Sequence, residues 1–270
     1  MFVAVALALV FVTASAAKTT AQALDPLAFE QLAPTGRLRV GVAAGSTPGT
    51  GNVAIDPASG RPQGIGAELG AALARKLGVE VEWVTYLNSG ELTDAGAIGA
   101  WDVAFMPVDE NRKQKVDFGA AHIVLESTWM VGPGSPIRTL ADVDVPGTRV
   151  VGVENTASAR AAQRYLKNVT VGVVKSTDEG FELLRTGRVD VTGGSRESLV
   201  VLSKLLPGSR VLEGAYFNSY VAVAVPKDRP AALAYATAFV EEAKASGLVR
   251  HALDSFGMQT SIIPPVGTKP

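Results

Sequence analysis

The chain has 270 residues, no cysteine and nearly balanced charge, with 25 basic and 26 acidic residues. This length suggests one large domain or two modest ones, and 47% hydrophobic residues suffice for a packed core. Disulfides and cysteine nucleophiles are excluded, and no basic run favours nucleic acid as a partner. The two histidines, His122 and His251, lie far apart without a ligand at helical spacing, so neither a metal centre, a Ser-His-Asp triad nor a cofactor is expected.

The N-terminus predicts a secretory signal peptide over residues 1–23. Residues 2–12 form an apolar stretch too short to span a bilayer, and the small residues that follow fit cleavage after Ala23. No Lys or Arg stands between Met1 and this stretch, which leaves the true translation start open. Because no other apolar run reaches about 18 residues, the mature protein is predicted to be soluble in the periplasm.

The rest of the chain alternates predicted strands with predicted helices. Apolar periodicity and glycine punctuation predict, in the first part, strands over 36–42, 79–86 and 101–105 and helices over 64–77 and 91–98. After a crossing strand over 124–131, the pattern begins again with strands over 148–153, 170–174 and 188–192 and helices over 156–166, 177–185 and 195–205.

A second apolar run over 220–225 predicts a return crossing, which the amphipathic helices 229–245 and 248–256 follow. The sequence therefore predicts an α/β fold of two lobes joined by two hinge strands. The first lobe is expected to be discontinuous, over 24–130 and 222–270, and the second is expected over 131–221.

Within the stretch Gly99–Phe118, a cation follows a buried strand. Pro107 ends the apolar run, and Arg112 stands in the polar segment after it. Ligands bind at this edge of open α/β sheets, and a guanidinium offers a planar pair of donors that matches a carboxylate. Arg112 is therefore a candidate to hold an anionic group, with a surface pair to Asp109 or Glu110 as the structural alternative.

This stretch resembles the Asp-Val…Glu-x-Arg…Asp-Phe-Ser block of the periplasmic solute-binding proteins of polar amino-acid ABC transporters, the bacterial extracellular solute-binding protein family 3. Residues 181–190 are similar to the family's Ala-Leu-x-x-Leu-x-x-Gly-x-x-Asp pattern, and matching stretches cover most of the mature chain. The resemblance implies the type II periplasmic-binding-protein fold, an inner-membrane ABC permease as partner and a monomeric state. It also implies that Arg112 clamps the carboxylate of a small organic anion, an amino acid or a related carboxylate.

Departures from the family pattern concern the ligand's amine. The family places an Asp five residues beyond the Asp of its second pattern to receive the ammonium, whereas this chain, counted from Asp190, has Ser195 followed by Arg196. A neutral hydroxyl beside a cation lacks the charge-assisted acceptor that a desolvated ammonium needs. An ordinary α-amino acid is therefore disfavoured. At the carboxylate site, the family's Ser or Thr five residues before the Arg is Pro107 here, which removes a hydroxyl and a backbone N–H.

Other residues are weighed as ligand contacts against structural roles. Asn155, Thr156 and Ser158 begin a predicted helix, where they either form an anion cradle or serve as plain N-caps. Ser195 and Arg196 are further candidates, although Arg196 at a helix start is equally compatible with a solvated side chain.

Glu126 interrupts the apolar crossing strand, where a carboxylate is costly unless it is paired. It either accepts a ligand's ammonium or hydroxyl, or bridges to Arg112 or Lys113. The nearby aromatic residues offer apolar contact or, as the favoured interpretation, core packing; these are Trp129, Tyr216 and Phe217.

Together these patterns predict a solute-binding protein, and not an enzyme, that captures a small carboxylate-bearing ligand by lobe closure and presents it to a permease. The chain has no Gly-x-x-x-x-Gly-Lys-Ser/Thr loop, so ATP hydrolysis would belong to a partner. One alternative is a cyclohexadienyl-dehydratase-like enzyme, which would need Glu126 or Glu197 as a general acid. A second alternative is a soluble ligand-sensing partner of a membrane receptor.

Overall fold

The computed structural model describes residues 25–43, 53–259, 261–268 and 270. The predicted signal peptide, with its cleavage site after Ala23, lies outside these residues. In the part of the chain that is described, no helix combines the length and the apolar character needed to span a membrane.

Two parallel units of strands share one mixed sheet. In the first unit β1 (Arg37–Ala43) lies between β4 (Glu80–Tyr86) and β5 (Val103–Pro107). In the second unit β7 (Val150–Val153) lies between β8 (Val171–Val174) and β9 (Val191–Ser195). In each unit the outer strands run parallel to the central one, so each unit presents its carboxyl ends at one edge.

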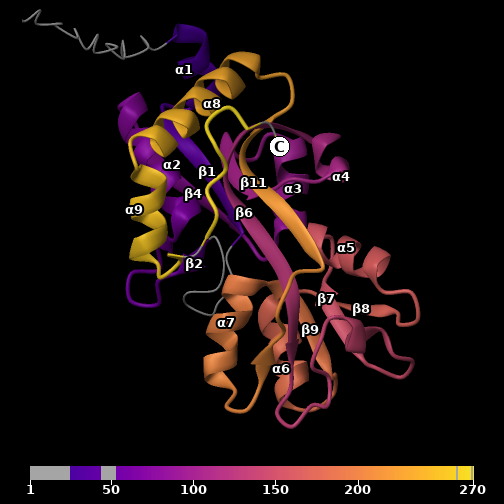
Figure 1. The fold of residues 1–270 in the computed structure, drawn as a ribbon. Coiled ribbons are helices and arrows are strands. Elements are labelled where there is room, and N and C mark those ends of the chain that lie inside the picture. The colour runs from indigo at the N-terminus through magenta and orange to yellow at the C-terminus, as the bar shows by residue number, and fades with distance from the viewer. Residues whose placement is uncertain (1–24, 44–52, 260, 269) are drawn as a thin grey trace, which may run out of the picture.

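Two long antiparallel strands, β6 (Val116–Val131) and β11 (Phe217–Pro226), pass through both parts of the molecule and join the two units (Figure 1). The order among the described strands is β4-β1-β5-β11-β6-β9-β7-β8, and the short β10 (Arg210–Val211) pairs with β6. Both predicted crossings are thus present as adjacent strands, and the predicted boundaries at 130/131 and 221/222 fall within them.

Helices cover both units of the sheet. The first unit carries α1 (Pro26–Leu32), α2 (Ile65–Leu77), α3 (Ser89–Ala97), the short α4 (Glu110–Lys113), α8 (Pro230–Ala245) and α9 (Leu248–Ser255). The second carries α5 (Ala157–Tyr165), α6 (Thr177–Arg185), α7 (Arg196–Leu205) and a 3-10 turn over Ala141–Asp144. Near α2, the strands β2 (Ala54–Ile55) and β3 (Pro62–Gln63) pair with each other.

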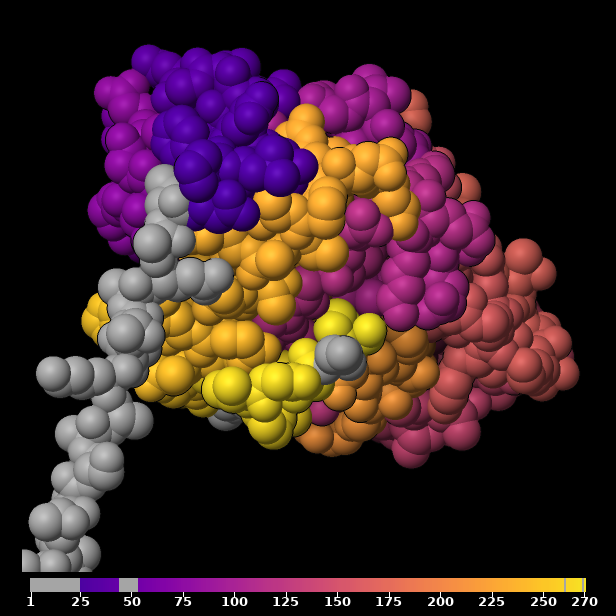
Figure 2. Space-filling view, turned by 90° about the horizontal axis from the view of Figure 1, so that it is seen from above, coloured from indigo at the N-terminus to yellow at the C-terminus, as the bar shows by residue number. Residues whose placement is uncertain are grey.

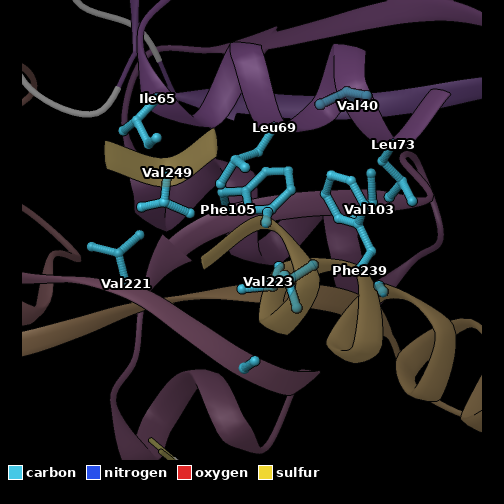
Figure 3. Packing of buried hydrophobic residues seen from close by; sticks show 14 of the residues in the cluster. Val40, Ile65, Leu69, Leu73, Val103, Phe105, Val221, Val223, Phe239 and Val249 are labelled. Atoms are coloured by element: carbon cyan, nitrogen blue, oxygen red, sulfur yellow. The ribbon is translucent and has the colours of Figure 1, made fainter. Parts of the chain in front are cut away.

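Two separate hydrophobic clusters define what we call lobe 1 and lobe 2. In lobe 1, Leu69 and Leu73 of α2 pack in one buried cluster with Val103 of β5 and Phe239 of α8 (Figure 3). Full burial of one such side chain contributes roughly 1.5–3 kcal/mol. In lobe 2, Trp129 of β6 stacks on Tyr216, with ring centroids 4.1 Å apart.

Both described ends of the chain contribute to lobe 1. Helix α1, near the start, contacts α8, and Figure 2 shows the indigo N-terminal residues against the orange residues of the returning chain. This arrangement confirms an α/β fold of two lobes.

The predicted strands and helices are confirmed with shifted ends. The largest shift is in β6, which begins at Val116 and not at residue 124, because it pairs with β11 along that whole length. Strand β5 begins at Val103, after Asp102, whose buried carboxylate accepts hydrogen bonds from Arg39 and Arg229. It also continues through Pro107, since proline is tolerated at a strand end.

Candidate functional site

A cavity lies between the two lobes, at the carboxyl ends of strands from both. Its lining includes Ala43 at the end of β1, Pro107 of β5, Val153 of β7 and Ser195 of β9. This is the edge at which open α/β sheets form ligand crevices. The cavity volume is about 190 Å³. Pockets for drug-sized ligands measure roughly 300–1,000 Å³, so the cleft suits a smaller solute.

The cleft is lined by hydroxyl groups and apolar side chains. Apolar contact comes from Leu92, Phe105, Leu125 and Phe217 among others. The hydroxyl-bearing residues of the lining are Ser89, Ser127, Thr156, Ser158, Thr177, Ser195, Ser198 and Ser219. Among the described residues of this lining none is charged, and the segment 44–52 has no charged residue in its sequence.

Four helices begin at the cleft. Each of them follows a parallel strand, and the cavity touches Ser89 of α3, Ala157 of α5, Thr177 of α6 and the N-cap Ser195 of α7. The N-cap side chains accept hydrogen bonds within the first turn of each helix. Since the first N–H groups of a helix lack partners within it, each of these N-termini carries partial positive charge.

Arg112 lies behind this lining and not within it. Its side chain is only 2% exposed, Nη1 donates to the carbonyl of Pro107 at 2.7 Å, and Nη2 donates to Oγ of Ser89 at 2.7 Å. Burial lowers the pKa of Arg112 to about 10, with Asp109 opposing the shift and Arg160 adding to it. The guanidinium is therefore charged at neutral pH and reaches the cleft through Ser89.

The two lobes touch beside Arg112. Its Nη2 also lies 3.4 Å from the carbonyl oxygen of Asn155 in lobe 2. Asp109 at the start of α4 forms an ion pair with Arg160 of α5, and a Cβ atom on Gly90 would lie 2.5 Å from Cβ of Asn155. The side chain of Asp109 lies 3.5 Å from Nε of Arg112 as well, so one carboxylate faces two cations. These contacts describe a closed arrangement of the lobes.

The predicted residues of the α5 and α7 starts lie at the cleft. Thr156 is the N-cap of α5, with Oγ1 accepting from the N–H of Ala159, and Ser158 bonds to the Tyr216 hydroxyl, whose pKa is raised by burial. Ser195 is the N-cap of α7 and donates to Oγ of Ser198. Asn155, at a φ of 58°, turns its carbonyl toward Arg112 and is not among the residues lining the cavity.

Glu126 and Arg196 pair with each other outside the cavity lining. Arg196 Nε lies 2.7 Å from Oε2 of Glu126, and the guanidinium also donates to the carbonyls of Leu212 and Gly214. The bridge from Glu126 to Arg112 or Lys113 is therefore wrong, because Arg196 is its partner. Burial raises the pKa of Glu197, and this residue too lies outside the lining.

The aromatic candidates have different positions. Trp129 and Tyr216 pack together in the lobe 2 core, whereas Phe217 lines the cleft. Sequence reasoning missed Asn88 and Ser89, because it started the helix at residue 91 and so passed over the N-cap that precedes α3. The described residues contain no group of three or more His, Cys, Asp or Glu side chains that could hold a metal ion.

Comparison with known proteins places the chain in a family. The model of the bacterial extracellular solute-binding proteins, family 3, matches residues 38–259. The glutamine-binding protein of Geobacillus stearothermophilus is 24% identical over 166 residues, which are 60% of this chain and 63% of that protein. The matched region is thus less than two thirds of the relative's length.

Solved structures give the same result for the fold. An ancestral amino acid-binding protein, described as a precursor of cyclohexadienyl dehydratase, superposes with a TM-score of 0.75 at 24% identity, covering 84% of this chain and 98% of the other. An ancestral arginine-binding protein bound to glutamine gives a TM-score of 0.73 at 26% identity, covering 83% and 98%. The solute receptor for L-cysteine of Neisseria gonorrhoeae gives 0.75 at 21% identity, covering 85% and 92%.

These matches define the class of protein as a two-lobed solute-binding protein. The chain belongs to the bacterial extracellular solute-binding proteins, family 3. The resemblance identified from the sequence is thereby confirmed.

Proposed function

We propose that this protein is the solute-binding component of an ABC importer, which captures a small carboxylate-bearing ligand between its lobes and delivers it to an inner-membrane permease. The observation that carries the proposal is the cleft itself, a small cavity walled by both lobes at the carboxyl ends of their parallel strands. Family membership and the amino-acid binding proteins among its relatives support it.

The binding step is closure of the lobes about the strands β6 and β11, with the lobe boundaries near residues 130/131 and 221/222. The interlobe contacts of Asp109 with Arg160 and of Asn155 with Arg112 support this step, since they join the lobes directly beside the cavity. A ligand favours the closed form in proportion to the contacts that it makes only when both lobes surround it.

The ligand's carboxylate is placed against Ser89, with Arg112 behind it. Ser89 accepts a hydrogen bond from Arg112 Nη2, which leaves its own O–H to donate to the ligand. Thr156, Ser158 and Ser195 are proposed to contact the remainder of the ligand from lobe 2. Glu126, Arg196 and Asn155 are assigned supporting roles, because their side chains do not line the cavity.

The protein is proposed to act as an exported monomer in the periplasm, without turning over its ligand. The extracellular family supports export. A dehydratase of this fold would need a general acid in the cleft, and the described lining holds no carboxylate, with Glu126 and Glu197 both outside it.

A thermal-shift screen of the mature protein tests the function. A ligand that binds only the native state raises the unfolding midpoint by mass action, so at least one small carboxylate is expected to raise it. Amines without a carboxylate serve as the control set and are expected to leave it unchanged. Co-purification with a receptor and not with a permease would contradict the transport role, and conversion of prephenate or arogenate would contradict the non-enzymatic one.

A further inference from the structure

The charge distribution around the cleft restricts the ligand more narrowly than the proposed function does. We infer that the ligand is a small organic acid without an amino group, whose other polar groups are hydroxyl or carbonyl oxygens. This inference rests on the proposed function, because it concerns the ligand of the same cleft.

An ammonium group would meet no carboxylate among the described residues of the cleft lining. No Asp or Glu is among the described residues of the lining, and residues 44–52 include none by sequence. The hydroxyls of Ser195 and Ser198 are already hydrogen-bonded to each other at 2.7 Å. A desolvated ammonium would therefore have only neutral acceptors, and burying a charge without a charged partner is strongly unfavourable.

Two carboxylates near the cleft, those of Glu126 and Asp109, are already paired with arginines. Glu126 is paired with Arg196 at 2.7 Å. Asp109 is shared between Arg160 and Arg112. Neither can turn to an ammonium in the cleft without giving up a cation that it already neutralises.

Helix starts and a cation surround the cleft. The N-termini of α3, α5, α6 and α7 all reach the cavity, and each carries roughly half a positive elementary charge. Behind Ser89, the two cations Arg112 and Arg160 share the one carboxylate of Asp109, so this group adds a net charge of +1. Acidic residues in the first turns of α3, α6 and α7 offset part of this charge, but they lie outside the lining; they are Glu91, Asp178, Glu179 and Glu197. The described lining therefore offers hydroxyl donors to an anion and no carboxylate to an ammonium, so the cleft discriminates between acids that differ only in the substituent next to the carboxylate.

Matched pairs of ligands test the inference by calorimetry. L-lactate and L-alanine, L-malate and L-aspartate, L-2-hydroxyglutarate and L-glutamate, and L-3-phenyllactate and L-phenylalanine differ only in hydroxyl against ammonium. In the pairs that bind, the hydroxy acid is expected to bind at least about tenfold more tightly. The inference is overturned if the amino acid binds equally well or better, and also if no hydroxy acid of the set binds.

Different results would overturn the solute-binding function and the inference that the ligand lacks an amino group. Tight binding of amino acids with an increased unfolding midpoint would overturn the inference and leave the solute-binding function standing. Failure of every solute to raise the midpoint would overturn both.

A pair of substitutions at Ser195 provides a second test, in which both variants should still fold. Asp and Asn both serve as N-caps, so Ser195→Asp and Ser195→Asn should each keep helix α7, whose N-cap is Ser195. The Asp variant is expected to bind hydroxy acids at least about tenfold more weakly than the Asn variant does. Its affinity for a hydroxy acid should also exceed its affinity for the matching amino acid by a smaller factor. Equal hydroxy-acid affinities in the two variants would contradict the inference.

Discussion

Outside the cleft lining, Arg112 of lobe 1 and Arg196 of lobe 2 have different surroundings. In lobe 1, Arg112 is buried and donates to a carbonyl and a hydroxyl. In lobe 2, Arg196 keeps 25% of its side chain exposed and is neutralised by Glu126. Each lies in a helix that follows a strand, Arg112 within α4 and Arg196 at the start of α7, so their positions in the sequence do not distinguish them. Their partners do, because Arg112 shares Asp109 with Arg160 and this group keeps a net charge of +1, whereas the pair of Arg196 and Glu126 is neutral.

Strand β6 supports both walls with a buried ring, and here too the walls differ. His122 lies behind Phe105 of lobe 1, with ring centroids 5.5 Å apart, and Trp129 lies behind Gly193 of lobe 2. The His122 ring can gain a proton, and the Trp129 ring cannot. The stability of the lobe 1 wall should therefore depend on pH. The stability of the lobe 2 wall should depend on the volume of the side chains that pack against Trp129.

The largest expected effect is on ligand affinity after Arg112→Met. This change removes the buried cation and leaves the Pro107 carbonyl without its donor, so ligand binding should weaken by about 2–5 kcal/mol. Arg196→Met is the matched control, and it should cost far less because its charge is already neutralised outside the lining. Calorimetry with the best ligand measures both. A greater loss of ligand affinity for Arg196→Met than for Arg112→Met would show that Arg196, and not Arg112, is the more important cation for binding.

A second prediction concerns stability against acid. Burial, and then the charge of Lys244, lower the pKa of His122 to about 3, and neither ring nitrogen has a hydrogen-bond partner in the described structure. Because the unfolded chain binds this proton more readily, stability should fall as the pH decreases from about 6.5 toward 3, by on the order of 4 kcal/mol.

Urea unfolding at several pH values measures this loss. His122→Leu should flatten the decline between about pH 6.5 and 4, since the variant has no proton to take up at this position. His251→Gln is the control, because His251 is exposed on α9, and it should unfold as the unaltered protein does. An acid profile unchanged by His122→Leu would show that the loss arises elsewhere.

Two neighbouring glycines probe the packing of the lobe 2 wall. A Cβ atom on Gly193 would lie 2.6 Å from the Trp129 ring, whereas one on Gly194 would lie 3.5 Å from Leu199, an ordinary contact. Gly193→Ala should therefore lower the free energy of unfolding by about 1–3 kcal/mol, and Gly194→Ala should change it little. Chemical denaturation compares the variants. Equal stabilities would mean that Trp129 moves aside easily.

The smallest expected effect on ligand affinity comes from the contact of Asp109 with Arg160 between the lobes. Arg160→Gln removes the ion pair with Asp109 and leaves that carboxylate to Arg112 alone, which should weaken ligand binding by about 1 kcal/mol. Asp109→Asn keeps the N-cap of α4 but frees Arg112 of its carboxylate, so its loss should be smaller, and the double variant should lose no more than Arg160→Gln alone. Additive losses in the double variant would indicate that the two residues act independently.

The fold could be predicted from the sequence to a large degree, and the site only in part. Apolar periodicity and glycine punctuation are local signals, so they placed the strands and helices, including the two crossings that became β6 and β11. Thr156 and Ser195 could be placed at the cleft because helix starts after parallel strands share one edge of a sheet.

The partners of the charged residues could not be predicted. Arg112 meets Ser89 and Asn155, which are distant in the chain, and Glu126 meets Arg196 across two neighbouring strands. Such pairs depend on the register of β6 with β9 and on the approach of the lobes, and periodicity fixes neither. The sequence therefore indicated which residue types would reach the cleft, but not which charges would remain unneutralised there.

The central claim is that the lobes close on a small carboxylate held between their two walls. Small-angle X-ray scattering of the mature protein, with and without the carboxylate that most raises the unfolding midpoint, measures this closure directly. The account predicts a smaller radius of gyration at saturating ligand, as the contacts of Asp109 with Arg160 and of Asn155 with Arg112 form. Saturated binding with an unchanged radius of gyration would contradict it.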